Sequence, residues 1–330
     1  MKKRILALAA IVIALLLFTL FIYRTGNVSE LLGKLNNAVE RPIFLISGAS
    51  LFLISLLCGT LRWYVLLRTL KFNITLPETI RLYASGHFFS ILAPGMTGGD
   101  VVKATWIAIK CPNSRTEAVT SIVAERMIGL MAMVIFITSI AVFRHDFFAE
   151  KPECIILRNT FFGGCGVIIA IVITLAAVDL GKIADRLKIE PKTFSAKLFD
   201  VTVRIWKTLR ICIMHPVATA TAFALSFLNH FTDVCCYFLL SKAIAMKIQF
   251  KDLLVISPIS NTIVAIPATP GGVGMRENAL QIMMQYIDIP YTESAALGLL
   301  MSATIFFWAI ICGIILLITP SLRKIARQRV

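Results

Sequence analysis

The stretch "ILAPGMTGGDVVKA", residues 91–104, interrupts an otherwise apolar chain with a proline–glycine pair, a glycine pair and an aspartate. Proline removes a backbone donor and glycine weakens a helix, so a continuous membrane helix is not expected here. Residues 99–110 are also too few to cross a bilayer, which takes about 20 apolar residues. We therefore predict that residues 76–110 form a helix, a break and a second helix, which enter the membrane and return to the same side.

The rest of the chain has the composition of an integral membrane protein. It contains 330 residues, of which 58% are hydrophobic. Its first apolar run is longer than the core of a signal peptide and lacks a small-residue cleavage site, so we expect it to be retained. Apolar runs of spanning length predict an all-α polytopic protein with about six spanning helices, at residues 5–22, 43–67, 117–142, 159–178, 216–240 and 293–319.

The interruption occurs a second time, in residues 252–288, where Pro258, Pro267 and Pro270 break the apolar pattern. The motif Pro94-Gly95-x-x-Gly98 recurs as Pro270-Gly271-x-x-Gly274. Two such hairpins entering from opposite sides predict an inverted repeat, as in transporters whose discontinuous helices meet near the midplane. The alternative is a chance recurrence, because other identity between the two stretches is sparse. The predicted organisation is one membrane domain, residues 1–330, with repeat units 43–142 and 216–319 joined by a linker, 143–215.

The distribution of basic residues indicates the orientation. With the amino terminus inside, 22 lysines and arginines lie in inside segments and 9 in outside segments. This difference follows the positive-inside rule and predicts that both termini are cytoplasmic. It also explains the net charge of +15 without nucleic acid, which we do not expect as a partner.

Six charged residues fall inside the predicted membrane region. Each is expected to pair or to face a cavity, because a charge in the bilayer costs about 3 kcal/mol or more. Arg126 and Arg276, with the starts of the half-helices, are typical of a site for an anionic headgroup. The alternative is purely structural pairing, with Arg126 on Glu277 and Arg276 on Asp100, and glycines that only allow tight helix crossing. The six residues are Asp100, Glu125, Arg126, Asp233, Arg276 and Glu277.

Other basic residues lie near the predicted membrane surface. Arg62, Arg68 and Arg81 are interpreted as snorkelling residues, with phosphate contact as the alternative. Residues 179–215 mix basic and apolar side chains at helical spacing. They predict an amphipathic helix that rests on anionic lipid, or an ordinary solvated linker helix.

Catalytic signatures are missing from the sequence. It contains no nucleophile elbow, no nucleotide-binding glycine loop and no cluster of metal ligands, so we expect neither an enzyme nor a cofactor. The eight cysteines form no C-x-x-C pair and are interpreted as packing residues. His87 and His230 are interpreted in the same way, because no second histidine accompanies them at a metal-binding spacing.

Three motifs together carry a family resemblance: "LAPGMTGGDVVKA", the pair Glu125-Arg126, and "PATPGGVGMRENAL". They resemble flippase-like membrane proteins related to the transmembrane region of lysylphosphatidylglycerol synthase. The resemblance implies a bacterial-type inner-membrane protein that handles anionic phospholipids, polyprenyl-phosphate-linked sugars or hopanoid-type lipids. The synthase has a soluble aminoacyl-transfer domain after its membrane part, so lysyl transfer by this chain alone is not expected. The motif positions in this chain are Pro94, Gly95, Gly98, Gly99, Asp100, Glu125, Arg126, Pro270, Gly271, Gly272, Gly274 and Glu277.

The resulting hypothesis is a lipid flippase that works without nucleotide hydrolysis. Glu125 and Glu277 are candidates for proton coupling, because the pKa of a buried carboxyl responds to its partner. Two alternatives remain open. One is a non-transporting, lipid-binding or scaffold subunit of a complex that makes lipids or glycans. The other is a lipid-modifying enzyme like the synthase.

Overall fold

The computed structural model describes residues 19, 27–91, 97–111, 114–149, 152–180, 182, 194–264, 269 and 271–318. Helices, and no strands, occur in these ranges, which confirms the all-α prediction. The helices are α2 (Val28–Glu40), α3 (Pro42–Thr69), α4 (Leu76–Ser90), α5 (Thr97–Lys110), α6 (Arg115–Phe143), α7 (His145–Ala149), α8 (Pro152–Ala177), α10 (Phe194–Ile213), α11 (Pro216–Ala243), α12 (Phe250–Val264), α13 (Met275–Gln285) and α14 (Tyr291–Ile318).

Five of these helices, α3, α6, α8, α11 and α14, are long and apolar enough to cross a membrane. They coincide with five of the six predicted spans, and the sixth, residues 5–22, falls outside the described residues except for Thr19. Helix α8 begins at Pro152 instead of residue 159. A proline at the first helical position and Glu153 in the first turn both favour this earlier start.

The two interrupted stretches each contain a pair of helices. Helices α4 and α5 flank the first break, and α12 and α13 flank the second, so the predicted order of helix, break and helix is present in both. The predicted break at Pro258 is wrong, because α12 continues through this residue. Pro258 lacks the N–H that would donate to the Leu254 carbonyl, and membrane helices tolerate such a loss where neighbouring groups or small local adjustments compensate for it.

The chain forms two compact units. Unit 1 comprises residues 1–57, 80–103 and 229–330, and unit 2 comprises residues 58–79 and 104–228, so α3, α4, α5 and α11 contribute to both. The predicted single domain with two repeat units stays a prediction.

In unit 1, α13 packs against both α12 and α14. Helix α2, which lies between the predicted spans 5–22 and 43–67, packs on α14. Lys34 pairs with Glu293 at 2.6 Å, and Thr292 donates to Glu30 at 3.0 Å. Asn27 caps the start of helix α2, because its side chain accepts the Glu30 N–H, and this capping pattern is readable in the sequence.

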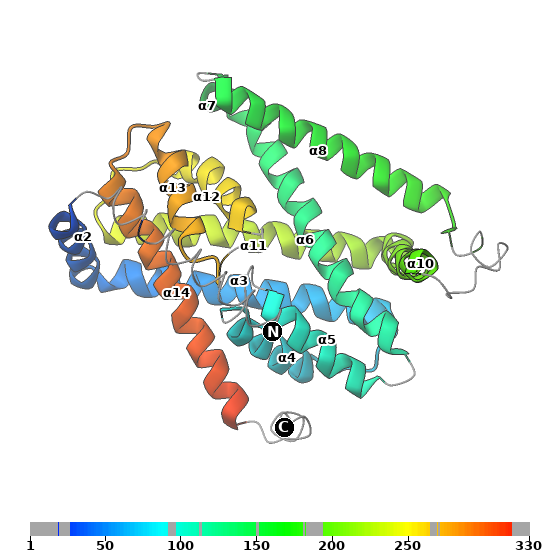
Figure 1. Cartoon of the computed structure of the whole chain (residues 1–330). Coiled ribbons are helices and arrows are strands. Elements are labelled where there is room, and N and C mark those ends of the chain that lie inside the picture. The colour runs from blue at the N-terminus through cyan, green and yellow to red at the C-terminus, as the bar shows by residue number, and fades with distance from the viewer. Residues whose placement is uncertain are drawn as a thin grey trace. The chain divides into compact units, whose positions relative to one another are not determined.

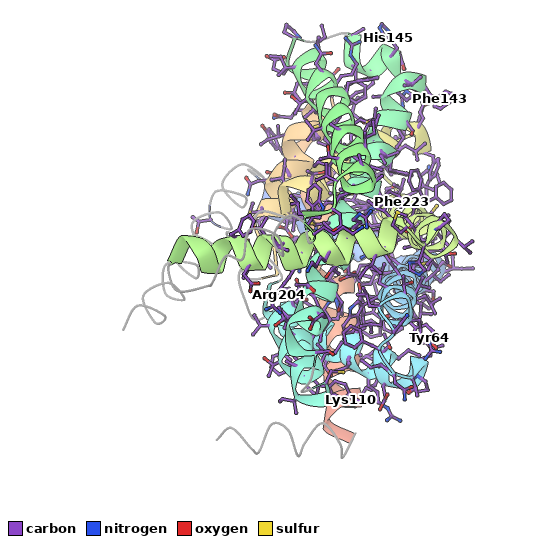
Figure 2. All side chains as sticks on the ribbon, turned by 90° about the vertical axis from the view of Figure 1, so that its right-hand side faces the viewer. Tyr64, Lys110, Phe143, His145, Arg204 and Phe223 are labelled. Atoms are coloured by element: carbon purple, nitrogen blue, oxygen red, sulfur yellow. The ribbon has the colours of Figure 1, made fainter. Side chains whose placement is uncertain are left out.

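In unit 2, α6 packs against α8 and α10, and α7 turns the chain between α6 and α8 (Figure 1). Ala124, Leu175 and Leu209, one from each of the three long helices, form a buried cluster. Figure 2 shows Phe143 and His145 together at the α7 turn, and Arg204 on α10. Helix α10 confirms that the predicted amphipathic segment is helical.

Candidate functional site

The second break is a glycine turn in unit 1. Gly271, Gly272 and Gly274 have φ angles of 60°, 74° and 80°, a region that side chains with a Cβ rarely adopt. At Gly272 a Cβ would also lie 2.3 Å from Cγ1 of Val264, the last residue of α12. This turn therefore requires glycine for its backbone and for its packing.

The same turn lies beside the end of α4. A Cβ on Gly271 would be 3.5 Å from the Cα of Ile91, which comes just before the first break. Within unit 1, the second break is thus in contact with the residue that leads into the first. Pro94, Gly95 and Pro270 fall outside the described residues.

Helix α13 starts with an internal cap. Glu277 Oε2 accepts the Gly274 N–H at 2.7 Å, and Asn278 Nδ2 donates to the Gly274 carbonyl at 2.6 Å. The carboxylate at the first turn also complements the helix dipole. The Gly274 N–H, which we expected to be open to a ligand anion, is therefore used within the chain.

Arg276 is buried next to this cap, with 3% of its surface exposed. Its Nη1 donates to the Ser302 hydroxyl at 3.1 Å, and that hydroxyl donates to Glu277 Oε1. A single hydroxyl thus separates the guanidinium from the carboxylate. Within the described ranges Arg276 forms no ion pair with a carboxylate, and its buried Nε has no hydrogen-bond partner.

Further buried polar groups lie in the same unit. Asn261 of α12 donates to Asp233 of α11, and the Tyr237 hydroxyl donates to Asn261 Oδ1 at 3.4 Å. Arg276 interacts electrostatically with Asp233. Gln281 is fully buried, and neither atom of its amide has a partner among the described residues. Unit 1 therefore contains buried polar groups that take no part in capping α13.

Glu125 lies in a different network, in unit 2. It forms an ion pair with Arg62, whose Nη1 also donates to the Ser226 hydroxyl at 3.1 Å. Arg62 and Glu125 are 9% and 3% exposed. Gly129 leaves room for the guanidinium, since a Cβ there would be 3.1 Å from Arg62 Nη1. The interpretation of Arg62 as a snorkelling residue is therefore wrong, because its charge is neutralised inside the protein.

Glycines at the first break have a packing role. A Cβ on Gly99 of α5 would lie 2.2 Å from the Gly86 carbonyl oxygen of α4, so these two helices cross with their backbones in contact. Asp100 pairs with Lys103 at 3.0 Å, and the Lys103 ammonium lies 5.1 Å from the centre of the Tyr83 ring. Gly98, half-buried, stands beside them at the start of α5.

The structure distributes the predicted residues over both units. Gly98, Gly99, Asp100, Asp233, Gly271, Gly272, Gly274, Arg276 and Glu277 are in unit 1, and Glu125 and the half-buried Arg126 are in unit 2. The convergence of Arg126 and Arg276 on one phosphate stays a prediction.

Sequence reasoning missed Arg62, Ser226 and Ser302. For Arg62 a signal was present, because the apolar helix continues for two turns beyond it. The two serines carry no such signal, since single hydroxyls are common in membrane helices and usually donate to a carbonyl of their own helix.

Comparison with known proteins agrees with the motifs. The family described as "Lysylphosphatidylglycerol synthase TM region" matches residues 5–313. A protein of Pyrococcus horikoshii, named as a UPF0104 membrane protein, is 22% identical over 288 residues, which cover 80% of this chain and 83% of the relative. No solved structure matches.

Proposed function

Because the chain belongs to the family of lysylphosphatidylglycerol synthase transmembrane regions, we propose that it moves an anionic lipid, or a lipid-linked intermediate, between the leaflets of a membrane. The observation that carries this proposal is Arg276, a buried cation beside a helix break that hydrogen-bonds a hydroxyl and forms no direct ion pair with a carboxylate among the described residues. Burying a guanidinium without a paired carboxylate is unfavourable, and a phosphate is the anion that its planar fork fits.

The geometry of the breaks supports movement of the lipid in addition to binding. The second break touches the residue that precedes the first, so two discontinuous elements meet beside the buried arginine. Interrupted helices that meet in this way surround the substrate sites of transporters, where one element rocks against the other. In our proposal both hairpins are re-entrant, the two halves form an inverted repeat, and the site opens alternately to each leaflet.

Topology labelling tests the arrangement in the membrane. In the proposed inner membrane with cytoplasmic termini, a single cysteine at Lys197 should react from the cytoplasmic side, and one at Glu150 from the outside. Reaction of both cysteines from the same side would contradict the inverted repeat.

Reconstitution tests the activity. Purified chain in phosphatidylcholine vesicles should move a fluorescent phosphatidylglycerol analogue between leaflets, measured by reduction of the outer-leaflet fluorophore with dithionite. Arg276→Lys should slow this movement at least about tenfold, because lysine retains the charge but not the fork. Arg68→Lys is the matched control, because Arg68 is an exposed arginine at the end of α3.

Two results would count against the proposal. Rates equal to those of empty vesicles, with the analogue still bound, would instead favour a non-transporting lipid-binding subunit. Equal slowing by Arg276→Lys and Arg68→Lys would show that Arg276 has no specific role in lipid movement.

A further inference from the structure

A second cationic site lies in unit 2, apart from the residues of the proposed transport site. It is a pocket of about 390 Å³. Its lining residues are Lys207, Arg210 and Ile211 of α10, Met214 and His215 directly after α10, and Asp179 and Lys182 after α8. This volume falls within the range of about 300–1,000 Å³ that is usual for small-ligand sites.

The charges around this pocket favour an anion. Three cations, Lys182, Lys207 and Arg210, face one carboxylate, Asp179. Arg210 Nη1 lies 3.3 Å from Asp179 Oδ2, while its buried Nε has no hydrogen-bond partner among the described residues. An unsatisfied buried donor is unfavourable, and an anion with several oxygens would satisfy it.

The edge of the pocket is apolar and open. Ile211 and Met214, which both line the pocket, are 42% and 56% exposed. Apolar side chains beside a cationic pocket match a ligand with a charged head and hydrocarbon tails. A soluble phosphate ester would leave these side chains in water.

We propose that this pocket binds the phosphate of an anionic membrane lipid. Lys207 and Arg210 contact the phosphate oxygens, and Ile211 and Met214 contact the glycerol and the first methylenes of the acyl chains. The site gives amphipathic α10 a specific lipid contact in addition to its general attraction to an anionic surface. It depends on the chain being in a membrane and not on transport.

Lysine footprinting of the full chain in neutral detergent tests the proposal. Dioctanoyl phosphatidylglycerol should slow the acetylation of Lys207 at least about fivefold, as measured by peptide mass spectrometry. Dioctanoyl phosphatidylcholine, glycerol 3-phosphate and inorganic phosphate should not. Equal protection by phosphatidylcholine would overturn the preference for an anion, and equal protection by inorganic phosphate would overturn the assignment to lipid.

Substitutions separate a built site from a diffuse cationic surface. Arg210→Gln should abolish protection of Lys207, and Arg204→Gln should retain it, since Arg204 lies on the same helix outside the pocket (Figure 2). Equal loss in both variants would show diffuse attraction and overturn the proposal.

Two further variants keep this test decisive. If Arg210→Gln fails to fold, the exposed Lys182→Gln should still weaken protection, and unchanged protection would contradict the site. Arg276→Gln should leave protection of Lys207 unchanged, so failure of this proposal is distinguishable from failure of the transport proposal.

Discussion

Two arginines, Arg62 and Arg276, are buried among the described residues, and both lie near a serine hydroxyl and a glutamate, in different arrangements. In unit 2, Arg62 pairs directly with Glu125 and also donates to Ser226. In unit 1, Arg276 donates to Ser302, which in turn donates to Glu277. Direct neutralisation leaves Arg62 little capacity for a ligand, whereas the intervening hydroxyl leaves Arg276 a charge that a phosphate can balance. The comparison shows that burial of an arginine alone does not identify a ligand site.

The largest expected effect separates the two arginines by stability. Arg62→Met should lower the free energy of unfolding by about 3–5 kcal/mol, because it leaves Glu125 buried without its partner. Arg276→Gln should cost about 1–2 kcal/mol, because it removes a hydrogen bond to a neutral hydroxyl. Thermal unfolding in detergent measures both changes.

The control for this comparison is a double substitution. Arg62→Met combined with Glu125→Gln should regain much of the lost stability, since no unpaired charge is left behind. If the order is reversed, with Arg276→Gln more damaging than Arg62→Met, the structural and ligand-binding roles are assigned the wrong way round.

The glycines of the two breaks provide an effect of intermediate size. Gly99→Ala should destabilise by about 1–3 kcal/mol through collision with a backbone carbonyl, and Gly272→Ala by a similar amount through its positive φ and its contact with Val264. Thermal unfolding in detergent measures both.

Gly166→Ala is the matched control for the glycines. Nothing lies within 4 Å of the position that its Cβ would occupy, so it should be neutral or should stabilise α8 by about 0.5–1 kcal/mol. Comparable destabilisation in all three variants would show that the breaks do not require their glycines.

The smallest effect concerns the ends of the first hairpin. Within unit 2, the start of α4 and the end of α5 are joined by an ion pair between Glu78 and Lys110. The hydrogen bond from Lys110, and then that from the Thr75 backbone, hold the pKa of Glu78 below its ordinary value. Stability from this lowered pKa is present above the ordinary carboxyl pKa and is lost as the pH falls through the folded value.

The measurement for Glu78 is a pH series. At pH 7, Glu78→Gln should cost about 0.5 kcal/mol, the range of partly exposed pairs. The difference from wild type should shrink as the pH falls below the ordinary carboxyl pKa and through the lowered pKa of Glu78. A difference that stays constant as the pH falls from 7 through the range in which carboxyls titrate would show that the ion pair contributes nothing.

The long helices were predictable, but the pairing of the charges was not. Runs of about 20 apolar residues identify a span without reference to any other part of the chain. The partner of Glu125 is Arg62, 63 positions away, and only the packing of α3 against α6 could select it. Pro258 shows the same limit, because whether a proline breaks a membrane helix depends on the groups that surround it in the fold.

The positions of the two breaks were predictable, but the roles of their glycines were not. The recurring motif located both interruptions, but it assigned them the same role. The structure gives positive φ angles to Gly271, Gly272 and Gly274 and a packing role to Gly99. A glycine in a sequence permits either role, and only the neighbouring backbone decides between them.

The central claim is that the charge of Arg276 serves a ligand and not the fold. Glu277→Gln retains an amide oxygen to cap α13, so the double variant Arg276→Gln with Glu277→Gln removes both charges while leaving the cap in place. The direct measurement is the rate at which this double variant moves fluorescent phosphatidylglycerol in vesicles, once its thermal stability in detergent is near that of wild type. We predict that the double variant is stable but does not move the lipid. A double variant that matches wild type in both stability and lipid movement would contradict the claim.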